Sequence, residues 1–190
     1  EAIDLLYGRQ LSVAVLAEDS IAKSILSFSK TNLFEDPYVL AVPKSVSLEN
    51  IKSLEDLKSS PIRKALSNII QFEFGNQHKK RIEEWFTSVL PNSKVFAKTR
   101  TYEVALSMVQ SGRGVAVIPA LAARLSGNLD FDVNLYRTNL PVRKIVSLIP
   151  SQYIRVEPYK SFIEALSDSG KNIKLPKIHK VPPILESLSL

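Results

Sequence analysis

No cysteine occurs among the 190 residues of this sequence, and this absence excludes disulfide bonds, thiolate nucleophiles and cysteine-ligated metal sites. Histidine is almost as scarce: the only two are His78 and His179, and neither is followed at helical spacing by a second metal ligand. The sequence also lacks any run of about 18 apolar residues, so it predicts no helix that spans a membrane and no membrane partner.

The first ten residues, EAIDLLYGRQ, carry early acidic residues and no long apolar segment, so they do not read as a signal peptide. The chain begins with Glu1 instead of methionine, and we expect a processed or cut start. The absence of cysteine suits a reducing compartment, and a cytoplasmic location is the expectation.

The residues that are present are typical of a folded globular protein. Hydrophobic residues make up 45% and charged residues 23%, which predicts one domain or two small lobes around a true core. The formal net charge is +6, but the cations are dispersed. The densest cluster, HKKR at 78–81, is followed by Glu83 and Glu84, so we interpret it as a solvated helix face. The sequence contains no motif of a nucleic-acid-binding module.

Apolar runs and helical periodicity alternate along the chain. Gly8 is expected to end a first helix, Pro119 to open another, and Ser53 with Asp56 to cap a short one. The stretch 18–35 has no clear pattern, and 171–190 is expected to be an extended arm or linker. Strands are expected at 11–17, 36–43, 68–74, 93–98, 114–118, 131–137 and 142–150, and helices at 76–90, 101–112 and 157–170, the last ending at Gly170. This alternation predicts an α/β fold with mainly parallel strands.

Signatures of catalysis are missing. No Gly-x-Ser-x-Gly elbow occurs, and the acidic pairs Glu83–Glu84 and Glu55–Asp56 lie on amphipathic helices as solvated residues. Trp85 is spaced as a core residue, and the two histidines are interpreted as solvated or structural. We therefore expect no catalytic residue, no metal and no cofactor.

The glycines of SGRGVAVIP raise the possibility of a phosphate-binding loop. Such a loop needs a strand, then glycines, then a helix, whereas here a helix precedes Gly112 and a strand follows Gly114. The free groups at a helix C-terminus are carbonyls, which disfavour phosphate. We interpret Gly112 as the end of the helix and Gly114 as part of a tight turn.

The opposite end of that helix is better suited to an anion. The segment KTRTYE places Thr99, Arg100 and Thr101 where a strand runs into a helix N-terminus. Backbone amides, two hydroxyls and a guanidinium could meet a carboxylate there. The alternative is a helix cap that satisfies itself, beside a solvated arginine.

The stretch TYEVALSMVQSGRGVAVIPALAAR (101–124) strongly resembles the effector-binding domain of LysR-type transcriptional regulators, a bacterial family. That domain typically has a helix with a polar start, a glycine-containing turn and a strand that ends in proline. The segments that follow the family's order are LLYGRQLSVAVL (5–16), FEDPYVLAVPKSVSLENIKSLEDLKSSPI (34–62) and HKKRIEEWFTSVLPNSKVFAKT (78–99), so the resemblance covers about residues 1–170.

The resemblance implies an α/β, two-lobed type-2 periplasmic-binding-protein-like fold. YVLAVP and KIVSLI are similar to its two crossover strands. Lobe I would be 1–42 plus 145–172, lobe II 43–144, and the C-terminal tail 173–190. Ser12 stands where the family has aspartate. The family's domain begins with a further strand and helix, and the resemblance implies that these parts of lobe I are not included in residues 1–190. The family's upstream DNA-binding domain is absent from this chain as well.

Ligands of this fold bind between lobes, near strand ends and helix N-termini. The resemblance therefore supports Thr99, Arg100 and Thr101 as ligand-binding residues. It adds the ends of two further strands, at Ala17 and at Gln71 with Phe72.

The implied function is the effector-sensing and oligomerisation domain of a LysR-type transcription regulator. It would bind a small metabolite, possibly a carboxylate or another anion, and change the arrangement of its lobes without catalysis. The expected partners are copies of itself in a homodimer or tetramer, and DNA only through an upstream winged helix-turn-helix domain. The alternatives are an extracytoplasmic solute-binding protein of the same fold and a small α/β enzyme.

Overall fold

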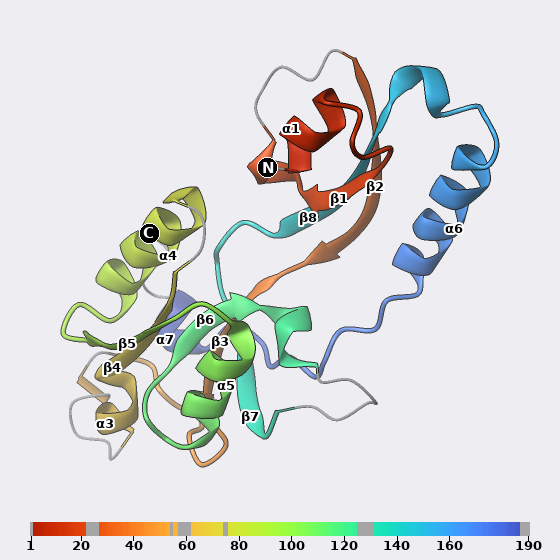
Figure 1. The fold of residues 1–190 in the computed structure, drawn as a ribbon. Coiled ribbons are helices and arrows are strands. Elements are labelled where there is room, and N and C mark those ends of the chain that lie inside the picture. Colours follow the sequence, from red (N-terminus) through yellow and green to blue (C-terminus); the bar gives the residue numbers. More distant parts are fainter. Residues whose placement is uncertain are drawn as a thin grey trace. The chain divides into compact units, whose positions relative to one another are not determined.

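The computed structural model describes residues 2–21, 27–53, 55–56, 62–73, 76–124 and 131–186, and for 76–78 the backbone only. The chain forms two compact units (Figure 1). Unit 1 comprises Glu1–Asp36 and Val142–Lys174, and unit 2 comprises Pro37–Pro141 and Leu175–Leu190. The units therefore divide at 36/37, 141/142 and 174/175, whereas the resemblance predicts boundaries at 42/43, 144/145 and 172/173.

Unit 1 is built on a three-stranded antiparallel sheet with the order β1-β8-β2. The central strand β8 carries buried Val146, Leu148 and Ile149. The elements of unit 1 are α1 (Ala2–Tyr7), β1 (Ala14–Ala17), η1 (Glu18–Ser20), β2 (Phe28–Asp36), β8 (Arg143–Pro150), η3 (Ser151–Tyr153) and α6 (Tyr159–Lys171).

Helix α6 packs on β2, and Gly170 sets how closely the two approach. A Cβ atom at Gly170 would lie 2.5 Å from the carbonyl oxygen of Leu33. Gly170 is buried inside α6, which continues to Lys171. The predicted end at Gly170 is thus correct to within one residue, and packing against Leu33 requires glycine there.

Unit 2 contains an antiparallel sheet with the order β6-β3-β7 and a parallel pair, β4-β5. A bridge between Ile69 and Val115 connects the pair to the chain just before β6. The elements are β3 (Tyr38–Pro43), α3 (Arg63–Leu66), β4 (Asn68–Phe72), α4 (Asn76–Val89), β5 (Lys94–Thr99), α5 (Tyr102–Gln110), β6 (Ala116–Pro119), η2 (Ala120–Ala123), β7 (Val133–Arg137) and α7 (Pro183–Glu186).

Apolar side chains cover both faces of β3, all of whose residues are buried. Alternate residues of a strand point to opposite faces. Leu40 accordingly packs in one cluster with Trp85 and Phe86 of α4, and Val39 packs in another with Leu106 of α5. Helices α4 and α5 thus bury opposite faces of unit 2.

The expectation of mainly parallel strands was wrong for the described residues. Both three-stranded sheets are antiparallel, and the parallel contacts are β4-β5 and two isolated bridges. A buried apolar run looks the same in either direction, so β8 gives no sign in the sequence that it enters its sheet antiparallel. Strand β2 lies in the stretch left without a pattern because SKTN is polar.

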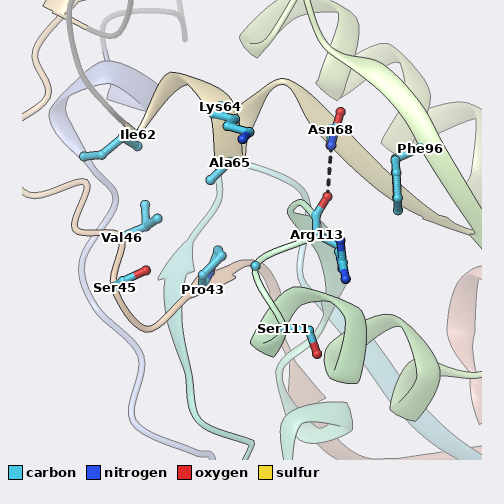
Figure 2. Close-up of a pocket in the computed structure, with 11 residues that line it drawn as sticks. Pro43, Ser45, Val46, Ile62, Lys64, Ala65, Asn68, Phe96, Ser111 and Arg113 are labelled. Atoms are coloured by element: carbon cyan, nitrogen blue, oxygen red, sulfur yellow. Dashed lines mark hydrogen bonds between the residues drawn. The ribbon is translucent and has the colours of Figure 1, made fainter.

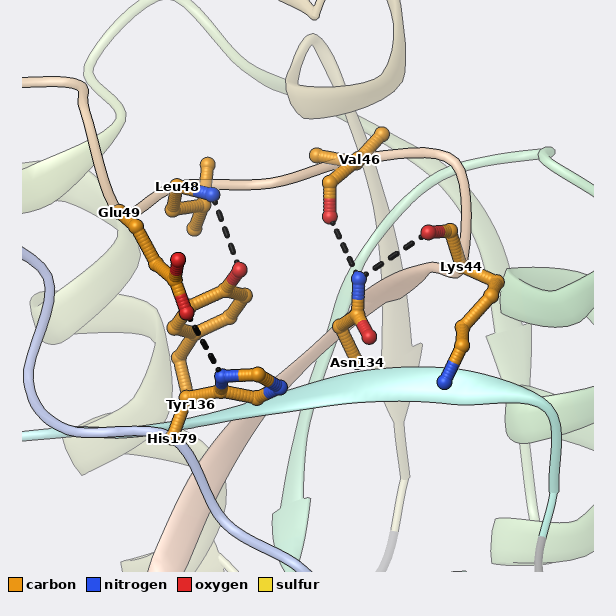
Figure 3. A network of polar contacts seen from close by, with 7 residues as sticks. All are labelled: Lys44, Val46, Leu48, Glu49, Asn134, Tyr136 and His179. Carbon is orange, nitrogen blue, oxygen red and sulfur yellow. Dashed lines mark hydrogen bonds and ion pairs between the residues drawn. The ribbon is translucent and has the colours of Figure 1, made fainter.

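The tail expected to be an extended arm or linker packs on unit 2. His179 forms a bridge with Tyr136, donates its N–H to the Leu135 carbonyl at 2.8 Å and stacks on the Tyr136 ring. In Figure 3 the imidazole ring of His179 is paired with Glu49, whose Oε1 lies 3.0 Å from His179 Nδ1. Tyr136 Oη accepts a hydrogen bond from the Leu48 amide. His179 is therefore structural, as expected.

Two further expectations concern Pro119 and membranes. Pro119 closes strand β6 and precedes the 3-10 turn η2, so it does not occupy the first position of an α-helix. None of the helices in the described part of the chain is both long and apolar enough to cross a membrane.

Candidate functional site

Strands β4 and β5 run parallel and end at the same edge of unit 2. Phe72 is paired with Thr99, and Gln71 with Lys98. Helix α5 begins at Tyr102, three residues beyond Thr99. The structure thus brings five of the six predicted site residues, Gln71, Phe72 and Thr99 to Thr101, to one strand-end and helix-start region.

Thr101 caps α5, as its sequence predicts. Its backbone is extended, with φ −129° and ψ 146°, and its Oγ1 accepts a hydrogen bond from the Val104 amide at 3.3 Å. Glu103 lies in the first turn, where the helix dipole favours an acid. Because this hydroxyl is used by the helix, it is a component of the scaffold whether or not it also meets a ligand.

Thr99 carries a buried polar atom without a protein partner. Its side chain is 6% exposed, and among the described residues nothing forms a hydrogen bond with its Oγ1. Its carbonyl, in contrast, accepts a hydrogen bond from Glu73 N at 2.8 Å. A buried hydroxyl that is left unpaired costs about 1–3 kcal/mol, and such groups concentrate where a water or a ligand completes the structure.

Phe72 contributes an aromatic wall. Its ring stacks on that of Tyr102, with centroids 4.0 Å apart and planes inclined by 22°. Tyr102 is the first residue of α5, so this pair joins the end of β4 to the start of the helix. Tyr102 was not among the residues predicted for the site, although its place directly after the helix cap was a usable signal in the sequence.

Gln71 points to the other face of the strand pair. It is 7% exposed, and its Nε2 donates a hydrogen bond to Glu83 of α4. Both residues line a pocket of about 330 Å³ beside α4, together with Ile82 and Phe86. The side chain of Gln71 thus belongs to the α4 face, whereas Phe72 belongs to the α5 face.

Charges of both signs surround the end of β4. Glu73 lies 3.0 Å from Lys98 Nζ and 3.7 Å from Lys79 Nζ. The hydrogen bond from Lys98 lowers the pKa of Glu73, and the charges of Lys98, Lys79 and Arg100 act in the same direction. Arg100 itself has no ion-pair partner within the described part of the chain, and its exposed guanidinium is available to an anion.

Ala17 is the sixth predicted residue and lies in unit 1, at the end of β1. Its side chain is 6% exposed, and its carbonyl accepts a hydrogen bond from Ser20 Oγ at 2.8 Å. Its role in ligand binding stays a prediction.

Two interpretations of single residues can be compared with the structure. Trp85 is 6% exposed within the core and donates Nε1–H to Asn139 at 2.6 Å, which confirms packing. Among the residues that the structure describes, no group of three or more His, Asp or Glu side chains could hold a metal ion. The side chain of His78 lies outside the described atoms.

The model of the LysR substrate binding domain family matches residues 1–171. The chain belongs to this family. The resemblance drawn from four ordered sequence segments is thereby confirmed, and with it the type-2 periplasmic-binding-protein fold. As a LysR substrate-binding domain, the chain is the ligand-sensing regulatory part of a LysR-type transcription regulator, a kind of domain that is not normally enzymatic.

Solved structures similar to this LysR domain are regulatory domains of the same family. Reduced OxyR from N. meningitidis is 18% identical with a TM-score of 0.60, over 88% of this chain and 75% of that one. QuiR in complex with shikimate is 16% identical (TM-score 0.57; 92% and 78% covered). CcmR of Synechocystis PCC6803 in complex with 2-PG is 13% identical (TM-score 0.59; 90% and 79% covered). No curated protein matches the sequence.

Proposed function

We propose that this LysR domain senses a small carboxylate, which binds where β4 and β5 end and α5 begins. The observation that carries the proposal is the Thr99 hydroxyl, which is buried at this edge and has no hydrogen-bond partner among the described residues. It lies beside a helix N-terminus and beside Arg100, and all three are suited to a negatively charged oxygen.

In this arrangement the carboxylate accepts hydrogen bonds from first-turn amides of α5 and from the Arg100 guanidinium. The stacked rings of Phe72 and Tyr102 provide an apolar surface for the carbon skeleton. The relatives QuiR and CcmR, solved with shikimate and 2-PG, support a small ligand, and shikimate carries a carboxylate. The roles of Ala17 and Gln71 in ligand binding stay predictions from the sequence, and the side chain of Gln71 faces α4 and not α5.

The domain acts without catalysis, in this proposal. The ligand stabilises one conformation more than another and so changes the population of states. The response reaches DNA through a winged helix-turn-helix domain in the whole regulator, which assembles as a homodimer or tetramer in the cytoplasm. The family membership supports these statements, and the chain itself supplies the sensor.

The test is a thermal-shift screen of small carboxylates, including shikimate and 2-PG, followed by calorimetry with the compound that raises the melting temperature most. Replacing Arg100 by Gln should weaken its affinity about tenfold, because a hydrogen bond to a charged group contributes about 1.5–3 kcal/mol. Thr101→Ala is less informative, since loss of the cap would also destabilise α5 by about 1 kcal/mol.

The matched control is Arg155→Gln, which removes the same charge from an exposed position in unit 1. Equal affinities for wild type, Arg100→Gln and Arg155→Gln would show that the anion binds elsewhere. A screen in which only neutral compounds raise the melting temperature would contradict the ligand class.

A further inference from the structure

Unit 2 has a second pocket, next to the C-terminal end of α5. It has a volume of about 480 Å³, which is in the range of sites for small molecules. Figure 2 shows its walls, which come from the segment after β3, from α3, from the two strands β4 and β5, and from the turn between α5 and β6. The lining residues include Lys64, Asn68, Phe96, Gly112 and Arg113.

Close backbone contacts fix the turn between α5 and β6 against the start of β4, on one side of this pocket. A Cβ atom at Gly114 would lie 2.5 Å from the Asn68 carbonyl oxygen, so the turn lies directly against the start of β4. Asn68 Nδ2 donates a hydrogen bond to the Arg113 carbonyl at 3.1 Å. Gly112 has a φ of +72°, and a Cβ atom there would meet nothing within 4 Å, so this part of the pocket has no side chain to fill it.

The charge of the lining is positive. Lys64 and Arg113 come from different walls, both are exposed, and no acidic residue is among the lining residues. Neither has an ion-pair partner within the described ranges. The helix carbonyls nearby do not oppose an anion strongly, because the amides of Gly112 and Arg113 bond back to the Val109 and Met108 carbonyls.

The remaining walls are apolar. Val46, Ile62 and Ala65 are partly or fully buried, and Phe96 is 51% exposed on β5. An exposed aromatic ring presents a face on which a flat ring can stack. Cations on two walls and an exposed aromatic ring beside apolar side chains together suit a ligand that is both anionic and aromatic.

We propose that this pocket is a second ligand site, which binds an aromatic carboxylate independently of the site at the start of α5. The two sites lie at opposite ends of the same helix. Lys64 and Arg113 would hold the carboxylate, and Phe96 would stack on the ring.

The experiment is a titration of the 190-residue chain with benzoate, followed through the backbone and side-chain amide resonances. We expect saturable shifts at Gly112, Arg113 and the Asn68 side chain. Benzamide has the same ring without the charge and should bind at least about fivefold more weakly, as expected for loss of about 1 kcal/mol of charge interaction.

Variants separate this site from the one at the start of α5. The double variant Lys64→Gln/Arg113→Gln should lose at least about fivefold in benzoate affinity. Phe96→Ala should weaken benzoate and benzamide alike, and Arg155→Gln/Lys160→Gln, a matched charge loss in unit 1, should leave both unchanged. Spectra of each variant show whether the fold is retained.

Three outcomes would overturn the proposal: no saturable shift up to the solubility of benzoate, equal binding of benzoate and benzamide, or shifts confined to Thr101–Glu103. The last would place the carboxylate at the proposed effector site alone. Failure of the effector site would instead appear as unchanged affinity in Arg100→Gln, so the two proposals fail separately.

Discussion

At the scale of single residues, the central observation is that Thr99 and Thr138 are equally buried but differently paired. Both are 6% exposed. The Thr138 hydroxyl donates to the Tyr38 carbonyl at 2.8 Å, whereas the Thr99 hydroxyl has no partner among the described residues. The two threonines therefore form a matched pair for measuring what an unpaired hydroxyl costs.

Thr99→Val should leave the free energy of unfolding unchanged or raise it by up to about 1 kcal/mol, because the substitution removes an unsatisfied polar atom without changing the shape of the side chain. Urea denaturation in the absence of ligand measures this. A loss of more than about 1 kcal/mol would mean that the hydroxyl is satisfied within the protein.

Thr138→Val serves as the control. It should lower the free energy of unfolding by about 1–2 kcal/mol, because the Tyr38 carbonyl loses the shorter of the two hydrogen bonds that it accepts from Thr138. If both variants lose the same amount, the distinction between the two hydroxyls does not hold.

The ion pair between Glu73 and Lys98 is expected to make the stability of the fold depend on pH. The folded protein lowers the pKa of this carboxyl, chiefly by the Lys98 hydrogen bond. The ion pair therefore contributes to stability above the ordinary glutamate pKa, and its contribution disappears as the pH falls through the lowered pKa.

Lys98→Gln should raise the pKa of Glu73 towards its ordinary value, and the carboxyl carbon resonance of Glu73 followed against pH measures it. Lys80→Gln is the control: it removes the cation that is paired with Glu84 on α4, and it should leave the pKa of Glu73 unchanged. A Glu73 pKa that is the same in Lys98→Gln and wild type would contradict the assignment.

At the scale of elements, local patterns were sufficient for helix α5 but not for the sheets. Its two ends could be predicted because the N-cap Thr101 and the positive-φ Gly112 each lie within a few residues of the end that they determine. The side chain of Gln71 points towards α4 because it bonds to Glu83, a residue of a different element. Strand β8 is antiparallel to β1, and its partner strand lies more than 120 residues earlier in the sequence. Neither leaves a local signal.

The contact between α6 and β2 provides the prediction at this scale. Gly170→Ala should lower the free energy of unfolding by about 1–3 kcal/mol, since the added methyl group would lie against the rigid Leu33 carbonyl. Helix propensity alone predicts the opposite sign, because alanine favours a helix interior by about 1 kcal/mol over glycine. Thermal or urea unfolding distinguishes the two.

Gly8→Ala is the comparison in the same unit. Its Cβ would approach the Asp4 carbonyl oxygen to only 3.3 Å, and the residue is exposed, so a change within about 0.5 kcal/mol is expected. Equal stability of Gly170→Ala and wild type would show that α6 can move away from β2.

At the scale of the whole molecule, the family and fold could be predicted because four segments keep their order along the chain, although none is decisive alone. The packing of the tail could not, since residues 175–186 lie beyond the family match, and three prolines interrupt any helical or strand periodicity of their apolar residues. Ile184 and Leu185 are nevertheless buried in the core of unit 2, an outcome that depends on partners such as Ile51 far upstream.

The candidate site was predictable only in part for the same reason. Strand ends and a helix start can be located from sequence, so Thr99, Arg100 and Thr101 could be named. The unpaired state of the Thr99 hydroxyl and the pocket between Lys64 and Arg113 arise from packing, and no spacing in the sequence encodes them.

The most direct test of the central claim is an amide-resonance titration of the whole chain with the carboxylate that raises its melting temperature most. We expect the largest shifts at Arg100, Thr101, Tyr102 and Glu103, and we expect Thr99→Val to bind the compound more weakly without being less stable. Largest shifts elsewhere in the chain, with unchanged affinity in Thr99→Val, would contradict it.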